Sequence, residues 1–466
     1  MKLARIIAPV LLLALAGGYV ALDGADIVPG PLTTRPVISE PAPRPVLEVE
    51  VPPAAAVDYR RPSAVPNDIS GVVAAFVASP DMGPRVALDI RDASTGERIA
   101  SHNPTQLGPP ASSTKVLTAA AALNRLGPTD TFATSVVLAP EAAGTAPDVG
   151  PEASAQQIVL VGGGDLLLGT GEPAAGVNGR ASLTVLASQT ATALAERGIT
   201  TVSLGVDDTL FEGRGVDVWT ELDYRYVINM TPLAISGGQE HASRVDYTIY
   251  TAETFAEELT AQGITVEGEP QRAPAPEGGA LIGMVESAPV EEVTAWMLKT
   301  SSNSVAEALA RHVAIARGEG NTAEAGAAAV TAEIRELGLP TTGLYLADTC
   351  GLAGENLISP ELLVETVQLA LGGTNPRLNP LVEGFPIAYL DGTLADRLHA
   401  VPGEIRAKTG TLTTVVSLTG IVEARSGARL TFSVVAGGLD PTGVESGVWG
   451  ARLGVDRFVA ALAENA

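Results

Sequence analysis

Residues 110–123 read Pro-Ala-Ser-Ser-Thr-Lys-Val-Leu-Thr-Ala-Ala-Ala-Ala-Leu, which places a serine and a lysine three positions apart at the start of an alanine-rich stretch. Gly127-Pro128 is a helix stop signal, so we expect a helix over 112–126 with Ser112 and Lys115 on one face. The helix dipole favours negative charge on the serine oxygen, and a lysine with a lowered pKa can accept its proton, which arginine cannot. On its own, a serine N-cap followed by a surface lysine is the commoner explanation.

Lysine is rare in this chain, and its positions are therefore informative. Only four of the 29 basic residues are lysines: Lys2, Lys115, Lys299 and Lys408. Lys408-Thr409-Gly410-Thr411 opens an apolar strand pattern that leads to Gly420. A lysine followed by small hydroxyl residues on a strand edge can bind a carboxylate, and Gly410 lets the backbone approach a ligand closely. The alternative is a solvated lysine that precedes a strand.

A third polar group, Ser301-Ser302-Asn303, lies within a stretch that we expect to form one helix over 296–316, closed by Gly318. A hydroxyl and a carboxamide two residues apart could relay a proton and hold a substrate carbonyl. Helix N-capping explains the same residue types without any chemistry. Each of the three patterns is weak when it is considered alone.

Together, SxxK, SxN and KTG in this order form the active-site signature of the penicillin-recognising serine enzymes. The chain also reads "VGGGD", "MLKTSSNSVAEALARH", "YLDGTLADRL" and "IRAKTGTLTTVVSLTG". From about Val73 to its C-terminus it closely resembles the D-alanyl-D-alanine carboxypeptidase/endopeptidase family, the low-molecular-mass class C penicillin-binding proteins of peptidase family S13. This resemblance implies an α+β fold of the penicillin-binding/β-lactamase type. An antiparallel sheet would be covered by helices on both faces, and a smaller α/β domain would be inserted into it.

The resemblance also implies a role for each motif residue. Ser112 would be the acylated nucleophile and Lys115 its general base, Ser301 would pass the proton to the leaving amine, and Asn303 would hold the substrate amide. Lys408 would supply positive charge, Thr409 and Thr411 would bind the terminal carboxylate, and the N–H groups of Ser112 and Thr411 would form the oxyanion hole. The implied partners are peptidoglycan stem peptides ending in D-Ala-D-Ala, with β-lactam antibiotics as covalent inhibitors. No cofactor is implied.

The order of the other elements suggests one domain interrupted by another. The patterns predict a hairpin over 86–100 with a turn at 94–96, alternating short strands and helices over 131–289, two strands over 414–423 and 430–436, and a last helix over 448–462. We therefore expect a split peptidase domain of residues 67–135 and 288–466, with an inserted domain of residues 136–287. Because only about fifty residues separate Lys115 from Gly162–Leu168, the nested third domain of some family members is expected to be missing.

The N-terminus is typical of an exported protein. Lys2 and Arg5 precede an apolar run that ends at Leu22, so residues 1–22 are predicted to be a signal peptide, with an uncleaved membrane anchor as the alternative. Residues 23–66 follow as a proline-rich linker. The expected location is extracytoplasmic, either secreted or associated with the cell envelope.

Composition excludes several classes of function. The chain has 466 residues, 46% of them hydrophobic and 18% charged, so large cores can form. A net charge of −24 makes nucleic acid a poor partner. The single cysteine, Cys350, excludes an internal disulfide framework, and no His-x-x-x-His spacing suggests a metal. We expect no metal site.

Other functions and local departures stay open at this point. A β-lactamase shares the acylation chemistry but needs a fast deacylation route. Class A enzymes have a dedicated glutamate, and class C enzymes have a tyrosine in the second motif, where this chain has Ser301. A non-catalytic wall-binding scaffold would not need the nucleophile–base pair, and GxSxG, the sign of a Ser-His-Asp hydrolase, is absent. Where the family often has Asp-Gly-Ser-Gly-Leu-Ser, residues 348–353 read Asp-Thr-Cys-Gly-Leu-Ala, so the site wall is expected to differ, with Cys350 a small buried residue.

Overall fold

The computed structural model describes residues 63–140, 155–235, 246–442 and 447–466, all of them in the unit Tyr59–Ala466. The predicted signal peptide or anchor (1–22) and the predicted linker up to residue 62 lie outside the described residues. Among the helices that the structure describes, none is long and apolar enough to cross a membrane.

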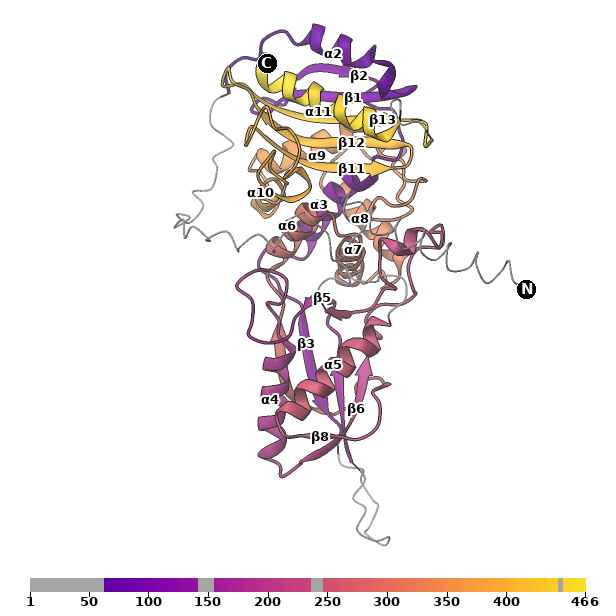
Figure 1. Ribbon diagram of the computed structural model, residues 1–466, viewed down its shortest axis with the longest axis vertical. Coiled ribbons are helices and arrows are strands. Elements are labelled where there is room, and N and C mark those ends of the chain that lie inside the picture. The colour runs from indigo at the N-terminus through magenta and orange to yellow at the C-terminus, as the bar shows by residue number, and fades with distance from the viewer. Residues whose placement is uncertain (1–62, 141–154, 236–245, 443–446) are drawn as a thin grey trace, which may run out of the picture. The chain divides into compact units, whose positions relative to one another are not determined.

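A five-stranded antiparallel sheet has the order β11-β12-β13-β1-β2 (Figure 1). Its strands are β1 (Arg85–Asp92), β2 (Arg98–His102), β11 (Ile405–Leu412), β12 (Val415–Glu423) and β13 (Arg429–Gly437). The predicted hairpin and the two predicted C-terminal strands are therefore confirmed. The first strand of the chain pairs with the last one, β13, so both ends of the described chain form this sheet.

The two faces of this sheet differ in chemistry. One face is apolar: Leu88, Leu418 and Phe432 are buried in one cluster with α2 (Ser70–Val77) and α11 (Val448–Asn465), which confirms the predicted last helix. The other face carries buried hydroxyls such as Thr419 and Ser433, and α9 (Pro360–Leu371) packs on it. Helices thus cover both faces, and the predicted α+β class is confirmed.

A group of helices surrounds α3 (Lys115–Arg125), whose alanine-rich sequence is buried almost throughout. Small side chains let the neighbours pack closely: a Cβ on Gly326 would lie 3.2 Å from the backbone of Ala310. The neighbours of α3 are α6 (Val290–Thr300), α7 (Asn303–Arg317), α8 (Ala323–Glu336), α9 and α10 (Asn379–Glu383). Short 3₁₀ turns are η1 (Pro80–Met82), η2 (Ala111–Thr114), η3 (Asp223–Arg225), η5 (Pro376–Leu378) and η6 (Gly392–Leu394).

Two predicted helices need correction. The single helix expected over 296–316 is two helices, because Ser301 adopts a left-handed conformation (φ 59°, ψ 33°) that ends α6. The Ser302 hydroxyl then accepts from the N–H of Val305 and caps α7. The helix expected over 112–126 begins as the 3₁₀ turn η2 and is α-helical from Lys115.

A second sheet is built from residues between Ala133 and Glu286. Its order is β10-β3-β4-β6-β8, with β9 beside β6, and the β4–β6 and β6–β8 pairings are parallel. Its elements are β3 (Ala133–Leu138), β4 (Gln156–Val161), β6 (Thr201–Asp207), β8 (Thr265–Val266), β9 (Gln271–Arg272) and β10 (Ala280–Glu286), with helices α4 (Leu183–Ala195) and α5 (Tyr247–Ala261). A separate pair is formed by β5 (Asp165–Leu168) and β7 (Leu233–Ile235).

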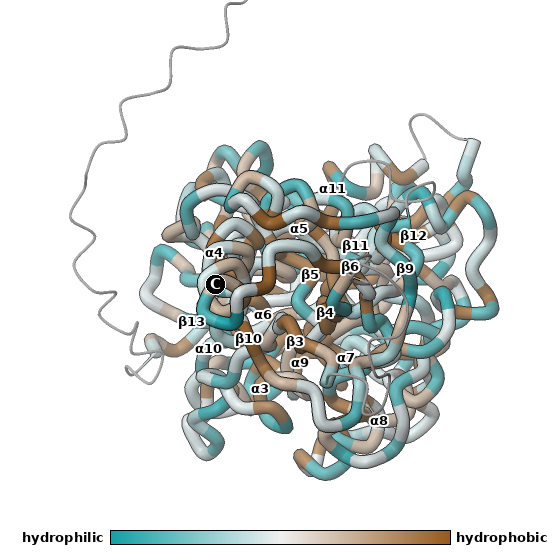
Figure 2. Tube along the Cα trace, turned by 90° about the horizontal axis from the view of Figure 1, so that it is seen from below, coloured by the Kyte–Doolittle hydropathy of each residue, from teal (hydrophilic) through white to brown (hydrophobic). Residues whose placement is uncertain are grey.

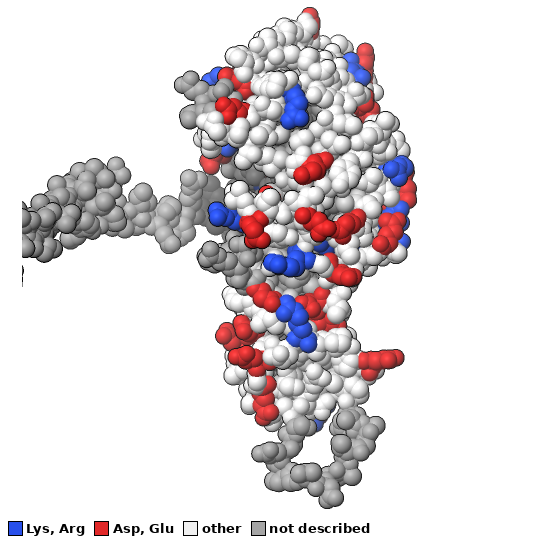
Figure 3. All heavy atoms as spheres, turned by 90° about the vertical axis from the view of Figure 1, so that its right-hand side faces the viewer, with Lys and Arg blue, Asp and Glu red and all other residues white. Residues whose placement is uncertain are grey.

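Hydropathy and charge follow this architecture. Hydrophobic residues concentrate on the inner strands of the second sheet and hydrophilic residues on the peripheral loops (Figure 2). Acidic and basic side chains are interspersed on the face in Figure 3. Several arginines are held by two carboxylates each; Arg272, for example, pairs with Asp208 and Asp246.

Candidate active site

The turn that carries Ser112 is set by local backbone geometry. Ala111, which follows two prolines, is left-handed (φ 51°), and the 3₁₀ turn η2 begins there. Ser112 is half-buried, while Lys115 one turn later is fully buried. The Lys115 Nζ lies 3.1 Å from the Ser112 Oγ. The structure therefore brings the predicted nucleophile and the predicted base into hydrogen-bond contact.

The Lys115 amine has two further partners from distant parts of the chain. Its Nζ donates to the Asn303 Oδ1 at 2.7 Å and to the backbone carbonyl of Cys350 at 2.6 Å. Burial lowers the pKa of Lys115 below its ordinary value, and the nearby Cys350, Asp348 and Glu307 oppose this shift. This environment favours the neutral amine more than water does.

Asn303 is the first residue of α7, and its amide is fixed on both sides. The Nδ2 donates to the carbonyl of Tyr226 at 2.9 Å, which leaves Oδ1 directed at Lys115. Tyr226 belongs to the stretch between the first two motifs. The orientation of Asn303 therefore depends on a residue of the predicted inserted domain.

A second group of contacts surrounds Lys408 on β11. Its Nζ donates to the Ser301 Oγ at 2.9 Å and to the Thr409 carbonyl at 2.8 Å. Lys408 is fully buried, and burial, then Lys115 and Arg397, hold its pKa well below the ordinary value. Ser301 is adjacent in the chain to the turn that positions Asn303, so the contacts of Lys408 and Lys115 meet at the start of α7.

The strand after Lys408 supplies hydroxyls of different exposure. Thr409 is buried and donates its hydroxyl to the Thr393 Oγ1 at 2.8 Å, while Thr411 is exposed. Thr393 lies in η6 and is half-buried. The structure places Thr393 beside the KTG strand, where it can reach a group bound along that strand.

Gly410 has a packing role that the sequence did not predict. A Cβ at this position would lie 2.2 Å from the Ser417 Oγ and 2.4 Å from the Pro110 carbonyl. The missing side chain therefore allows β11 to approach β12 and the turn that carries Ser112. The position that a Cβ of Gly410 would take is filled by the protein itself.

Three contacts of this site were not predicted from the sequence. The carbonyls of Tyr226 and Cys350 are backbone groups, and backbone acceptors leave no signal in residue type. Thr393 had a signal, because it lies within the family-like text "YLDGTLADRL", but that text alone assigned it no role.

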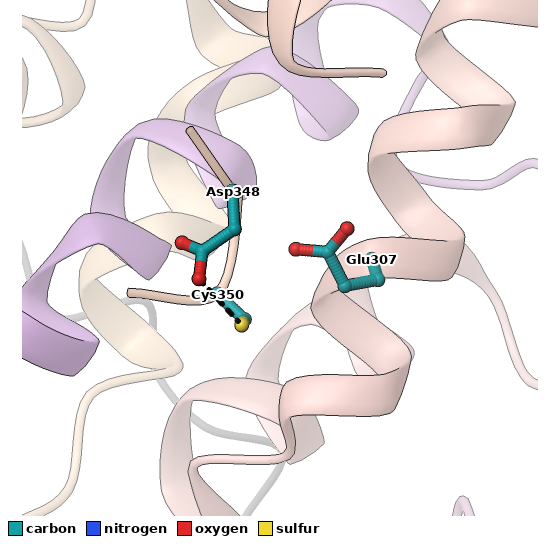
Figure 4. Close-up of side chains that lie close together, drawn as sticks. All are labelled: Glu307, Asp348 and Cys350. Carbon is teal, nitrogen blue, oxygen red and sulfur yellow. Dashed lines mark hydrogen bonds between the residues drawn. The ribbon is translucent and has the colours of Figure 1, made fainter. Parts of the chain in front are cut away.

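One group of described residues has the donor set for a metal ion: Glu307, Asp348 and Cys350 lie with their ligand atoms within 4.8 Å of one another (Figure 4). Their oxygens are already used by the protein. Glu307 accepts from Thr349 and Arg311, and Asp348 accepts from four N–H groups. A metal ion would have to displace these donors, so we assign none to the group.

Comparison with known proteins identifies the chain. Residues 69–246 and 233–448 match the family described as D-Ala-D-Ala carboxypeptidase 3 (S13). The chain belongs to this S13 carboxypeptidase family. It is 32% identical over 457 residues to carboxypeptidase DacB of Mycolicibacterium smegmatis, which covers 94% of this chain and 90% of that relative. It is 27% identical to the D-alanyl-D-alanine carboxypeptidase of Actinomadura sp. (strain R39), over 74% of this chain and 76% of that one.

The fold agrees with this identification. The crystal structure of penicillin-binding protein 4 (dacB) from Haemophilus influenzae has a TM-score of 0.64 and 21% identity, and the match covers 84% of this chain and 98% of that one. A second structure of that protein is complexed with a β-lactam. The S13 carboxypeptidase is thus an enzyme of the penicillin-binding serine peptidases, a class that acts outside the cytoplasm.

Proposed function

We propose that this S13 enzyme hydrolyses the terminal D-Ala-D-Ala bond of peptidoglycan stem peptides through an acyl-enzyme on Ser112. One observation carries the proposal: the Lys115 Nζ has three partners, of which only the Ser112 hydroxyl can donate a proton. The other two, the Asn303 Oδ1 and the Cys350 carbonyl, can only accept.

The number of N–H groups on the Lys115 amine determines whether it acts as a hydrogen-bond donor or as a base toward Ser112. A protonated amine donates to all three partners at once. A neutral amine keeps two N–H groups for the two acceptors, and its lone pair then faces the Ser112 Oγ–H. Loss of one proton converts Lys115 from donor to general base without moving an atom.

The contacts of Lys408 support a second proton path. Ser301 accepts from Lys408, so its own hydroxyl proton is free to go to the leaving amine after Ser112 has attacked. Asn303 would hold the substrate amide, and the N–H groups of Ser112 and Thr411 would stabilise the oxyanion, an effect of about 3–4 kcal/mol for each donor.

The KTG strand supports recognition of a free carboxylate. Burial disfavours the charged form of Lys408, and a carboxylate bound beside it restores that form. Thr409 is occupied as a donor to Thr393. The hydroxyls of Thr393 and Thr411 therefore remain to donate to the carboxylate, with Thr409 as the donor that orders Thr393.

The same acylation can serve related reactions. Carboxypeptidase and endopeptidase action differ only in the group on the C-terminal side of the scissile bond, and a carboxylate on the D-centre of a diamino acid fits the same strand. β-Lactams would be covalent inhibitors because they acylate Ser112. A β-lactamase is less well supported, since Ser301 stands where class C β-lactamases have a tyrosine in the second motif, and no deacylation residue is assigned here.

We also propose the domain division and the cellular location. Residues 67–135 and 288–466 would form the peptidase domain, with 136–287 inserted, which fits the chain range of the second sheet. Residues 1–22 would direct export, with cleavage or anchoring still to be distinguished by fractionating cells and sequencing the mature N-terminus.

The test of the acyl-enzyme is covalent labelling. Incubation with a fluorescent penicillin and mass spectrometry of the digest are expected to place one adduct on the peptide that contains Ser112. Ser112→Ala should abolish the adduct. Ser113→Ala is the matched control: its hydroxyl faces Ser417 Oγ at 2.8 Å, away from Lys115, and labelling should persist. An adduct that survives Ser112→Ala contradicts the proposal.

A further inference from the structure

The loop at residues 348–353 contacts the catalytic lysine through its backbone. The Cys350 carbonyl accepts from the Lys115 Nζ at 2.6 Å, and the Thr349 carbonyl accepts from the Thr118 hydroxyl at 2.6 Å. Gly351 is left-handed, and a Cβ there would lie 2.0 Å from the carbonyl of Ala111, the residue before Ser112. The loop is therefore wedged between α3 and the turn that carries the nucleophile.

Two buried carboxylates hold the N–H groups on either side of Cys350. The Glu307 Oε1 accepts from both the N–H and the hydroxyl of Thr349, each at 2.8 Å. The Asp348 Oδ1 accepts from the N–H of Gly351 at 2.7 Å. Figure 4 shows Glu307 on its helix, with its carboxylate directed toward Asp348 and Cys350.

Asp348 accepts from further donors. Its Oδ2 accepts from the N–H of Ala353 at 2.5 Å, the indole N–H of Trp219 at 3.0 Å and the thiol of Cys350 at 3.6 Å, and its Oδ1 accepts from the amide of Asn356 at 2.7 Å. Both oxygens of Asp348 are therefore held by protein donors. Trp219 comes from the stretch between the first two motifs, as Tyr226 does.

Stability alone does not call for this arrangement. Buried ionic groups are often no more stabilising than well-packed apolar side chains of the same volume. The two carboxylates fix the orientation of the loop instead. Each accepts from one peptide N–H, and the Cys350 carbonyl, which precedes the N–H of Gly351, points to the opposite side, toward Lys115. Asp348 and Glu307 also oppose the lowering of the Lys115 pKa by burial.

From this geometry we infer that Glu307 and Asp348 are positioning residues, which fix the Cys350 carbonyl so that the Lys115 lone pair faces Ser112. The inference rests on the proposed role of Lys115 as base. Neither carboxylate contacts Ser112. Both act through the backbone of residues 349–351.

The experiment separates binding from acylation for a fluorescent penicillin. Glu307→Leu keeps the volume and removes the acceptor for Thr349; we expect the acylation rate constant to fall by about 10²-fold, with the dissociation constant of the initial complex within about threefold. Glu307→Gln keeps an oxygen toward Thr349 and should recover acylation to within about fivefold of the parent. A merely structural role would not lower the acylation rate constant while leaving the dissociation constant unchanged, and it would not predict that Glu307→Gln restores acylation.

Glu333 offers a matched control. It is also a buried carboxylate on a helix of this region, and it binds Asn124, Arg125 and Arg317, away from Lys115. Glu333→Leu is expected to lower the melting temperature with the acylation rate constant unchanged. Equal acylation losses in Glu307→Leu and Glu333→Leu would overturn the inference.

A milder variant keeps the inference testable if Glu307→Leu does not fold. Trp219→Phe removes one donor of Asp348 and keeps an aromatic ring in place, and acylation should slow by about three- to tenfold. Parental acylation in folded Trp219→Phe would refute the positioning role. Ser112→Ala distinguishes failure of this inference from failure of the proposed function. If Ser112→Ala loses labelling, the acyl-enzyme on Ser112 is still supported even where the positioning role is refuted.

Discussion

At the scale of single residues, the site contains backbone strain beside its reactive groups. Ser301 and Ala111 both have left-handed φ angles without being glycine, and they lie next to the SxN and SxxK motifs. The left-handed conformation costs a non-glycine residue roughly 1–2 kcal/mol. Ser301 adopts this unfavourable conformation at the position where its hydroxyl accepts a hydrogen bond from Lys408.

This strain makes a prediction about Ser301. Ser301→Gly should raise the free energy of unfolding by about 0.5–1 kcal/mol, because glycine adopts this conformation freely. Turnover of D-Ala-D-Ala peptides should fall because the hydroxyl is lost. Denaturant unfolding and release of D-alanine measure the two effects. Ser301→Ala is the control that loses the hydroxyl and keeps the strain, so a stability gain there would contradict the explanation.

At the scale of elements, the site depends on the close approach of β11, β12 and the turn η2. Gly410 permits it, and the hydroxyls of Ser113 and Ser417 bond across the contact. The hydroxyl-lined face of the sheet lies on this side. The catalytic turn is therefore held by polar contacts to Ser417 on β12 and to the carbonyl of Lys408 on β11.

Gly410→Ala should push β11 away from Pro110. We expect a loss of about 1–3 kcal/mol in stability and at least a tenfold slower acylation, since small displacements of reactive groups are costly. Melting temperature and penicillin labelling rate report these effects. Gly354→Ala provides the comparison, because its Cβ would meet nothing within 4 Å; if it were equally harmful, the packing argument would fail.

At the scale of the whole molecule, two buried ionisable groups give stability a pH dependence. Burial raises the pKa of Asp165 to about 7 and lowers that of His312 to about 4. They line one small cavity between β5 and α7, where His312 also stacks on Phe132. Asp165 contributes stability that is present below pH 4 and is lost as the pH rises to 7, while the contribution of His312 is lost as the pH falls from 6.5 to 4.

Asp165→Asn tests this balance. The amide oxygen can still accept from the N–H of Leu167, and the ionisation is removed. Its stability relative to the parent should grow between pH 4 and pH 7 and then stay constant, with a total change of up to about 4 kcal/mol. Urea unfolding at pH 5 and pH 8 measures it. A difference that does not change with pH would show that Asp165 has the same pKa in the folded and the unfolded protein, which would contradict the argument.

Much of this architecture is predictable because local patterns agree with the fold. The hairpin of β1 and β2, the strands β12 and β13 and the helix α11 follow from alternation and turn residues. The site residues Ser112, Lys115, Asn303 and Lys408 follow from motif order. Long-range contacts decide the rest.

The break at Ser301 has only a weak local signal: Ser302 can cap a new helix, but serine does not prefer φ above zero. The contact of Ser301 with Lys408, on a strand 107 positions away, cannot be read from local sequence. The carbonyls of Tyr226 and Cys350 were equally hidden, because any residue type supplies a carbonyl. Gly410 was recognised as special, but what it approaches depends on the packing of three elements.

The burial of Lys408 has a thermodynamic consequence. A carboxylate that draws this amine back to its charged form must also draw a proton from the solvent. Binding of the peptide is then coupled to the uptake of a fraction of a proton by the protein. The affinity for the peptide therefore declines with rising pH, even in a pH range in which the peptide itself does not titrate. The measured heat of binding would contain the ionisation heat of whatever buffer gives up that proton.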